Sequence, residues 1–294
     1  MNKVGFIGVG IMGKSMVRNL MKAGFELHIY ARTKSKVEDV ISEGAQFHES
    51  IKDCVQDCDA VITIVGFPQD VEEVYFDEGN ILDSAKKGAY LIDMTTTSPQ
   101  IAEKIYAEGI KRGFHVMDAP VTGGDTGAKS GTLSILVGGE KEDYEACMPL
   151  FEAMGTNINY QGKAGCGQHC KLANQIMIAG TLSGVCEALT YAKEQGLDPE
   201  VFMKSVATGA AGSKQLDTFG PKILKDDYAP GFFMKHFIKD MKLALIEANR
   251  KGLSLDVLSM VLANYEELEQ EGYGDLGTQA LMKFYDEEHR NTEE

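Results

Sequence analysis

The first half of the chain alternates short apolar runs with longer stretches in which apolar and charged residues recur at helical spacing. Short apolar runs bounded by Gly, Pro, Ser or Thr are typical of buried strands. The runs at residues 27–31, 59–65 and 88–94 fit this description. Strands that alternate with helices predict an α/β fold with a doubly wound parallel sheet. The carboxyl ends of such strands face a ligand crevice, so residues 65–68 and 95–97 are expected to line it.

The pattern changes in the second half of the chain. Strand-like runs at residues 115–120 and 133–139 are the last ones, and strand signals stop near Gly162. A proline-free stretch follows at residues 168–195; it predicts one helix of some 40 Å that Gly196 terminates. We therefore predict a Rossmann-type domain over residues 1–163, joined by this long interdomain helix to an all-α domain over residues 164–294. The polar end of the chain, residues 286–294, is expected to fray.

The first apolar run passes directly into the pattern Gly-x-Gly-x-x-Gly, formed by Gly8, Gly10 and Gly13. A strand, a glycine turn and a helix in this order are the fingerprint of a dinucleotide site, although a glycine turn can also serve packing alone. Gly8 is expected to allow the tight turn, Gly10 to admit a pyrophosphate and Gly13 to let the helix pack closely. The residues assigned to the cofactor in this crevice are Gly8, Val9, Gly10, Ile11, Met12, Gly13, Val65, Gly66 and Phe67.

The residues after the second strand indicate which dinucleotide binds. A site that prefers NAD places a carboxylate there for the ribose 2′-hydroxyl, and residues 31–36 contain none. Arg32, Thr33 and Lys36 form a cationic, hydroxyl-bearing loop instead, which suits a 2′-phosphate. A solvated basic turn is the alternative explanation. We predict NADP(H) as the cofactor, with NAD as the other possibility.

Composition narrows the classes of protein. The 294 residues suggest two domains, and a hydrophobic content of 44% supports a large core. The net charge of −15 disfavours nucleic acid as a partner, because a polyanion would be repelled. The apolar runs fall short of a membrane span, and the chain starts without a signal-peptide pattern. The six cysteines lack the spacing of a secreted scaffold, so we expect a cytoplasmic protein with free thiols.

Polar residues cluster near the amino end of the predicted long helix. Lys171, Asn174 and Gln175 fall on one face there, because residues three and four apart are neighbours on a helix. A lysine that extends to solvent at a helix start is the alternative to a functional group. Cys166, His169 and Cys170 could also approach one another on this helix. No fourth metal ligand is evident, so we interpret them as packing residues and predict no metal site.

Four ordered segments resemble the β-hydroxyacid dehydrogenase family, which includes 3-hydroxyisobutyrate dehydrogenase, tartronate semialdehyde reductase and glyoxylate/succinic semialdehyde reductase. They are Gly-Val-Gly-Ile-Met-Gly at 8–13, Asp-Ala-Pro-Val-Thr-Gly-Gly at 118–124, Gly-Cys-Gly with the following Lys-Leu-Ala-Asn-Gln at 165–175, and Lys-Asp at 239–240. The resemblance covers essentially the whole chain. It implies an oxidoreductase that transfers hydride between NAD(P) and a small β-hydroxyacid or semialdehyde.

This resemblance implies a role for each matching residue. Lys171 would be the general acid/base: its ammonium form gives a proton to the substrate oxygen, and its amine form takes one. The implied substrate contacts are Thr122, Gly123, Gly124, Phe232, Asp240 and one of Asn174 and Gln175. Thr96 and Lys239 would contact the cofactor near its reacting end. Thr122 stands where the family more often has serine; its methyl group narrows the pocket.

The resemblance leaves the substrate open. Lys-Leu-Ala-Asn-Gln is similar to tartronate semialdehyde reductases, whereas the Arg32-Thr33 pair is similar to NADPH-using glyoxylate and succinic semialdehyde reductases. An NAD-dependent 3-hydroxyisobutyrate dehydrogenase or tartronate semialdehyde reductase is therefore one alternative, and a non-catalytic NADPH-binding module is another. Relatives are commonly dimers or tetramers. Apolar residues of the second domain predict such an interface here: Ile176, Met177, Leu182 and Leu189.

Overall fold

The computed structural model describes residues 1–285, and the chain divides into two compact units, Met1–Lys171 and Leu172–Glu294. The first unit contains a mixed sheet and the second is helical, so the predicted fold class is confirmed. The boundary falls inside one long helix, α10 (Cys166–Glu194), which begins two residues before the predicted start. The predicted fraying of residues 286–294 lies outside the described residues.

The sheet of the first unit has a parallel core in the order β3-β2-β1-β4-β5-β6. Its strands are β1 (Lys3–Ile7), β2 (Glu26–Tyr30), β3 (Gln46–Phe47), β4 (Ala60–Thr63), β5 (Tyr90–Asp93) and β6 (His115–Asp118). The pattern predicted all of these except β3, whose two residues are too short to give a signal. Because the strands are parallel, the carboxyl ends of β2, β1, β4 and β5 lie at one edge of the sheet.

Three strands extend the sheet beyond β6: β7 (Val121–Thr122), β8 (Leu133–Gly139) and β9 (Gly155–Gly162). β8 runs antiparallel to β6 and β7, and parallel to β9. The sequence pattern missed β9, because most of its residues are exposed or half-exposed and polar. An edge strand of this kind lacks the apolar run that marks a buried one.

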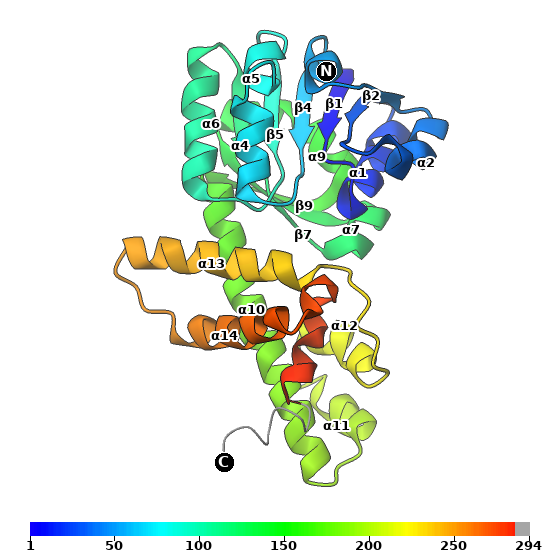
Figure 1. Cartoon of the computed structure of the whole chain (residues 1–294), viewed down its shortest axis with the longest axis vertical. Helices are drawn as coiled ribbons and strands as arrows, with labels where there is room; N and C mark the ends of the chain where they lie inside the picture. The colour runs from blue at the N-terminus through cyan, green and yellow to red at the C-terminus, as the bar shows by residue number, and fades with distance from the viewer. Residues whose placement is uncertain (286–294) are drawn as a thin grey trace. The chain divides into compact units, whose positions relative to one another are not determined.

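Helices cover both faces of the sheet. Alternate strand residues enter two separate cores, as Ile62 and Ile92 pack on the face of α1 and α9 while Val61 and Leu91 pack on the face of α3–α6. Figure 1 shows α4, α5 and α6 grouped together over the sheet. The helices are α1 (Ile11–Lys22), α2 (Glu38–Ser42), α3 (Ile51–Val55), α4 (Pro68–Phe76), α5 (Ile81–Ser84), α6 (Pro99–Lys111), α7 (Gly124–Ser130), α8 (Lys141–Ala146) and α9 (Met148–Met154), with the 3₁₀ turn η1 (Lys34–Val37).

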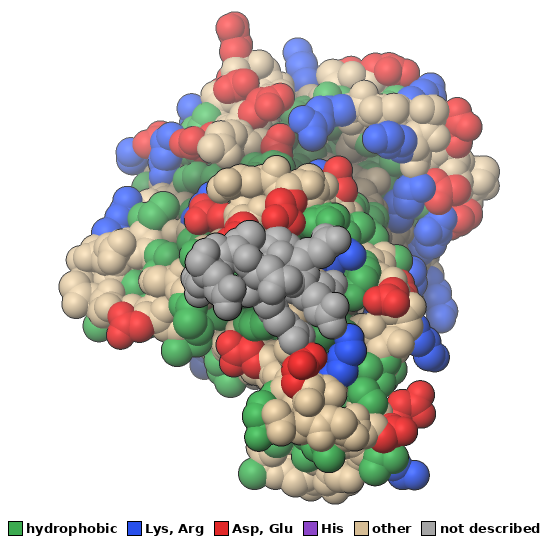
Figure 2. Space-filling model, turned by 60° about the horizontal axis from the view of Figure 1, so that its bottom comes forward, with side chains coloured by type: hydrophobic (Ala, Val, Ile, Leu, Met, Phe, Trp, Pro, Cys, Tyr) green, Lys and Arg blue, Asp and Glu red, His purple; other side chains and the backbone are tan. Residues whose placement is uncertain are grey.

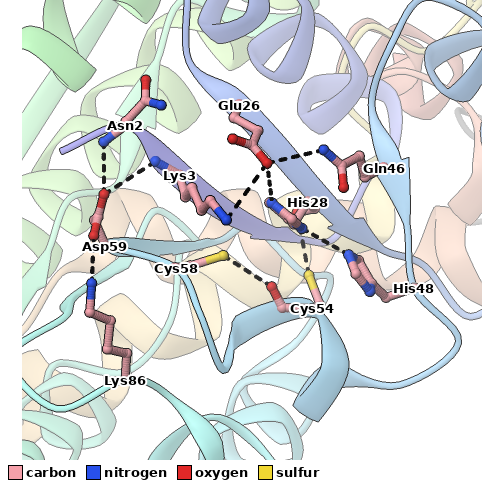
Figure 3. Close-up of polar contacts among 10 residues, drawn as sticks. All are labelled: Asn2, Lys3, Glu26, His28, Gln46, His48, Cys54, Cys58, Asp59 and Lys86. Carbon is pink, nitrogen blue, oxygen red and sulfur yellow. Dashed lines mark hydrogen bonds and ion pairs between the residues drawn. The ribbon is translucent and has the colours of Figure 1, made fainter.

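Polar side chains connect β1 and β2 to segments next to β3, β4 and β5 (Figure 3). Asp59 accepts hydrogen bonds from the backbone of Asn2 at 2.8 Å and from the Lys86 ammonium at 2.9 Å. On β2, the buried His28 ring contacts Glu26 Oε1 at 3.1 Å and the His48 ring nitrogen at 2.9 Å. These groups satisfy one another within the sheet, so we assign them a structural role.

The second unit packs around the part of α10 that follows Lys171. Its helices are α11 (Pro199–Val206), α12 (Lys214–Ile223), α13 (Met234–Arg250) and α14 (Asp256–Gln270), followed by the 3₁₀ segments η2 (Tyr273–Asp275) and η3 (Thr278–Tyr285). Leu182 and Leu189 of α10 are buried in its core together with Phe237 and Tyr265. After Glu194, Gly196 adopts a left-handed φ of 75° and its N–H bonds to Lys193 O, which confirms the predicted helix end.

Within the described residues, α10 is long and apolar enough, by length and composition, to cross a membrane. The expectation that the apolar runs fall short of a membrane span concerns uninterrupted runs, and the helix test does not contradict it. Alanine, glycine and leucine raise the mean hydropathy of this helix without forming one uninterrupted apolar run. Core helices of soluble proteins meet the same criterion, and 44% of the most apolar window is buried, so this finding is weak evidence for a membrane span.

Candidate functional site

In the loop between β1 and α1, the surroundings of the three motif glycines differ from one position to the next. Gly8 has a φ of 98°, and a Cβ there would lie 2.1 Å from Ile64 O. A Cβ on Gly13 would lie 2.1 Å from Gly8 O, so the close approach of α1 to the strand requires glycine there. A Cβ on Gly10 would meet nothing within 4 Å. Packing explains Gly8 and Gly13, whereas the space at Gly10 is open to a ligand, as the fingerprint predicts.

The loops after β2 and β4 meet at the same edge of the sheet. Arg32 Nη1 lies 3.3 Å from Asp70 Oδ1, and the other oxygen of Asp70 accepts a hydrogen bond from Phe67 N at 2.9 Å. Arg32, Thr33 and Lys36 are exposed, and the side chain of Arg32 is 76% accessible. Ile11 and Phe67 are also exposed, although both are apolar. A cationic loop beside exposed apolar side chains can receive a phosphorylated nucleoside.

The loop after β5 is connected to its neighbours by side-chain hydrogen bonds. Val65 N, after β4, donates to Thr95 Oγ1 at 3.0 Å. The next helix, α6, starts with Ser98 as N-cap and Pro99 as the first residue. Thr96, the predicted cofactor contact, is half-buried between two buried threonines, Thr95 and Thr97. The loops after β4 and β5 therefore form one connected rim.

Two buried carboxyl groups lie side by side below this rim, because Asp93 and Asp118 are paired in register at the ends of β5 and β6. Burial raises the pKa of Asp93 to about 6, against the lowering effect of hydrogen bonds from the Thr63 hydroxyl and Thr95 N. Burial also raises the pKa of Asp118, which accepts from Gly165 N and Gln168 N, each at 2.8 Å. Asp118 thus holds the first turn of α10 against β6.

Gln168 connects that first turn to the loop after β5. Its side chain is fully buried; Nε2 donates to Thr95 O at 2.7 Å, and Oε1 accepts from Thr97 N at 3.0 Å. Gln168 was not among the predicted site residues, because only its position three residues before Lys171 could have pointed to it. Lys171 itself is buried, with 7% of its surface exposed, and it is the last residue of the first unit.

The segment after β6 leads to the predicted carboxylate site. Thr122 ends β7, and Gly123 and Gly124 follow with φ values of 129° and 63°. Both values lie in the region that favours glycine, and both residues are exposed. The backbone at the start of α7 is therefore accessible at these two glycines.

In the second unit, four predicted residues are linked by two hydrogen bonds and one ion pair. Asn174 Nδ2 donates to Gln175 Oε1 at 2.8 Å, and Gln175 Nε2 donates to Asp240 Oδ2 at 2.7 Å. The Lys239 ammonium lies 3.0 Å from Asp240 Oδ1. Asp240 is fully buried, and Gln175 nearly so. Phe232 lies just before α13, is 37% exposed and stacks beside His236.

The predicted site residues thus form two groups. One comprises the glycine loop, the loops after β2, β4 and β5, the segment 122–124 and Lys171, all in the first unit. The other comprises Asn174, Gln175, Phe232, Lys239 and Asp240 in the second unit. Helix α10 carries Lys171 and Gln175 on one face, four residues apart. Across residues 1–285 there is no cluster of three or more His, Cys, Asp or Glu side chains that could hold a metal ion.

Comparison with known families gives two consecutive matches. Residues 3–162 match the NAD binding domain of 6-phosphogluconate dehydrogenase. Residues 165–285 match a family described as NAD-binding of NADP-dependent 3-hydroxyisobutyrate dehydrogenase. Together the two matches cover nearly all of the chain.

Individual proteins align along most of their length. An uncharacterized oxidoreductase, YkwC, of Bacillus subtilis is 49% identical over 96% of this chain and 98% of its own. The 2-hydroxy-3-oxopropionate reductase of Escherichia coli is 38% identical over 86% of each chain. The structure of a Mycobacterium tuberculosis 3-hydroxyisobutyrate dehydrogenase with L-serine superposes with a TM-score of 0.89, at 26% identity, over 97% of this chain and 99% of that one.

Proposed function

Because the chain belongs to the β-hydroxyacid dehydrogenase family, and is therefore an NAD(P)-dependent oxidoreductase acting on CH–OH groups, we propose that it transfers hydride between NADP(H) and a small semialdehyde or β-hydroxyacid. Lys171 is the proposed general acid/base. The observation that carries this proposal is a buried lysine one helical turn after Gln168, whose side chain is bonded to the loop after β5 at the rim of the crevice.

The glycine loop fits a dinucleotide. The space beside Gly10 is open, and a side chain at this position would occupy it. The N–H groups at the start of α1 can hold a pyrophosphate in this space. Val9, Ile11, Met12, Val65, Gly66 and Phe67 would contact the remainder of the cofactor. Exposed apolar side chains at Ile11 and Phe67 suit contact with an adenine ring or the sugars.

The loop after β2 supports NADP(H) over NAD(H). Arg32 can bind a 2′-phosphate through two nitrogens, with Thr33 and Lys36 beside it. Asp70 holds the Arg32 guanidinium near Phe67, at the edge where the ribose would lie. An NADP(H) phosphate would compete with Asp70 for this guanidinium, and NAD(H) would leave the ion pair in place.

Lys171 supplies the proton chemistry of the proposed reaction. The bound reduced nicotinamide would supply hydride to the substrate carbonyl carbon. The Lys171 ammonium donates a proton to the carbonyl oxygen, and in the reverse direction the neutral amine accepts it from the alcohol. Thr96 and Lys239 are proposed to contact the cofactor near its reacting end. A general acid of this kind contributes about 10²–10⁴-fold to the rate.

The substrate carboxylate is proposed to bind at Thr122, Gly123 and Gly124. A hydroxyl group and consecutive backbone N–H groups in a glycine-rich turn form a suitable anion cradle. The exposed backbone of both glycines supports this assignment. Phe232 and Asp240 are proposed to line the other part of the substrate site.

Asn174 is the better of the two amides for substrate contact. Both ends of the Gln175 amide are used within the protein, one by Asp240 and the other by Asn174. Gln175 would have to break a buried, charge-assisted hydrogen bond to reach a substrate. Asn174 uses its Nδ2 in this chain and is half-exposed, so its Oδ1 is proposed to contact the substrate hydroxyl or the Lys171 ammonium.

The protein is further proposed to be a cytoplasmic homodimer or homotetramer. Leu182 and Leu189, two of the residues predicted for an interface, are core residues instead. Met177, however, is 73% exposed, and other large apolar side chains of the second unit are exposed as well, namely Tyr191, Val201, Val257 and Met260. Figure 2 shows hydrophobic side chains among charged ones on the surface turned toward the viewer. Sedimentation at micromolar concentration is expected to give a dimer or tetramer, and a monomer would refute this proposal.

The deciding experiment follows NADPH and NADH absorbance with glyoxylate and with succinic, tartronate and methylmalonate semialdehydes. We expect turnover with NADPH, a loss of about 10²–10⁴-fold in Lys171→Ala, and unchanged NADPH affinity in that variant. Lys163→Ala, which changes an exposed lysine shortly before α10, is the control. Near-normal turnover in Lys171→Ala would refute the role of Lys171. Faster turnover with NADH would favour the NAD-dependent alternative, and tight NADPH binding without turnover would favour the non-catalytic module.

A further inference from the structure

Gln168 occupies a position from which it can control the geometry of the reaction without contacting the substrate. It lies on the first turn of α10, one turn before Lys171, and its side chain is fully buried. Its amide makes a paired contact with the loop after β5, through Thr95 O at 2.7 Å and Thr97 N at 3.0 Å. These two backbone groups flank Thr96.

The backbone of the same residue is fixed as well. Gln168 N donates to Asp118 Oδ2 at 2.8 Å, and Gly165 N donates to Asp118 Oδ1 at 2.8 Å. A Cβ on Gly167 would lie 2.3 Å from Leu136 O, so the start of α10 packs directly against the sheet. The first turn of α10 is thus held at two places. The buried carboxylate of Asp118 binds its backbone, and the loop after β5 binds the Gln168 side chain.

We propose that Gln168 is a positioning residue that sets Lys171 in register with the nicotinamide side of the crevice, through its paired hydrogen bonds to Thr95 and Thr97. This inference rests on the proposed function, in which Thr96 contacts the cofactor and Lys171 moves the proton. Lys171 and the loop 95–97 belong to the same compact unit, which ends at Lys171. The distance between the proposed general acid Lys171 and the loop 95–97 is therefore determined by packing within the first unit.

The size of the expected effect follows from the geometry of proton and hydride transfer. A displacement of about 1 Å in a reacting group can cost about 10²-fold in rate. Gln168→Met preserves the length and most of the volume of the side chain but removes both hydrogen bonds. It leaves Thr95 O and Thr97 N buried without their partner, so the loop and the helix turn can shift apart.

The first measurement does not depend on activity. In the ligand-free protein, residue-resolved hydrogen exchange should show the Thr97 amide exchanging about tenfold or more faster in Gln168→Met, because its acceptor is lost. Gln161→Met, a half-exposed glutamine on β9, is the matched control and should leave Thr97 unchanged. An unchanged Thr97 amide in Gln168→Met would overturn the inference even if the wild-type protein reduced none of the tested aldehydes.

The second measurement separates positioning from simple loss of stability. In Gln168→Met, kcat is expected to fall about 10–100-fold, with the NADP+ dissociation constant within about threefold of wild type. The isotope effect with NADPH deuterated at the transferred position should increase, because hydride transfer becomes slower. Leu150→Ala removes buried volume on α9 and should lower thermal stability while keeping kcat. Equal loss of kcat in the two variants, or wild-type kcat in Gln168→Met, would overturn the positioning role. Absence of turnover in the wild-type protein would count against the proposed function. The exchange rate of the Thr97 amide would still decide whether Gln168 holds the loop after β5 through its paired hydrogen bonds.

Discussion

Replacement of Asp93 by asparagine should stabilise the protein at neutral pH and lose this advantage in acid. Asp93 is buried at the end of β5, and burial raises its pKa from 3.8 to about 6. The amide of the substituted side chain can keep the oxygen that accepts from the Thr63 hydroxyl and from Thr95 N. Among the described residues, the other oxygen of Asp93, Oδ2, has no hydrogen-bond partner, so the substitution breaks no bond there.

The magnitude follows from the two pKa values. Because the folded pKa lies above the unfolded one, the folded state binds the proton more tightly, and ionisation weakens the fold. The loss of folding free energy caused by ionisation of Asp93 is absent below the unfolded pKa. It develops as the pH rises from the unfolded to the folded pKa and is complete above about pH 7. A difference of about 2 pH units corresponds to about 3 kcal/mol when the group is fully ionised.

Thermal unfolding of wild type and Asp93→Asn between pH 4.5 and 8 tests this reasoning. The advantage of the variant should grow by about 2 kcal/mol across that range, which is roughly 4–8 °C in Tm for a domain of this size. Asp77→Asn makes the same chemical change at the exposed end of α4 and should show no comparable trend. Equal destabilisation of the variant at every pH would mean that the pKa of Asp93 is the same in the folded and unfolded states. A disadvantage of the variant that grows as the pH rises would mean that the fold favours the charged carboxylate, and either result would refute the reasoning.

Two further predictions concern the cofactor crevice. Gly10→Ala should leave the Tm of the ligand-free protein nearly unchanged but raise the NADP+ dissociation constant at least about tenfold, whereas Gly13→Ala should also lower Tm, since its Cβ would lie 2.1 Å from a carbonyl oxygen. Calorimetry measures the NADP+ dissociation constant, and thermal unfolding measures Tm. Unaltered NADP+ binding by Gly10→Ala would show that no pyrophosphate binds in the open space beside Gly10. Arg32→Gln should reduce the ratio of kcat/KM for NADPH over NADH by about 10–100-fold, with Lys52→Gln on α3 as control; an unchanged ratio would refute the 2′-phosphate assignment.

The main features of the fold were predictable because they depend on local patterns. Apolar runs bounded by turn residues identified β2, β4, β5, β6 and β8, and a proline-free stretch ending at Gly196 identified α10. The spacing of Gly8, Gly10 and Gly13 predicted three separate roles. The backbone positions agree with the packing roles of Gly8 and Gly13, and the pyrophosphate contact of Gly10 stays a prediction. β9 escaped detection because its exposed polar residues carry no such pattern.

The candidate site was predictable only in part. The sequence alone determined the α/β order, the glycine loop, the cationic residues after β2 and the spacing of Lys171, Asn174 and Gln175 on one helix face. The tertiary structure decided that Gln168 bonds to residues 71 and 73 positions earlier in the chain, and that Gln175 bonds to Asp240, 65 positions later. It also decided that Asp93 is buried beside Asp118. Local spacing specifies the backbone of one element, whereas these partners meet only when distant segments pack, and only that packing removes water and shifts a pKa.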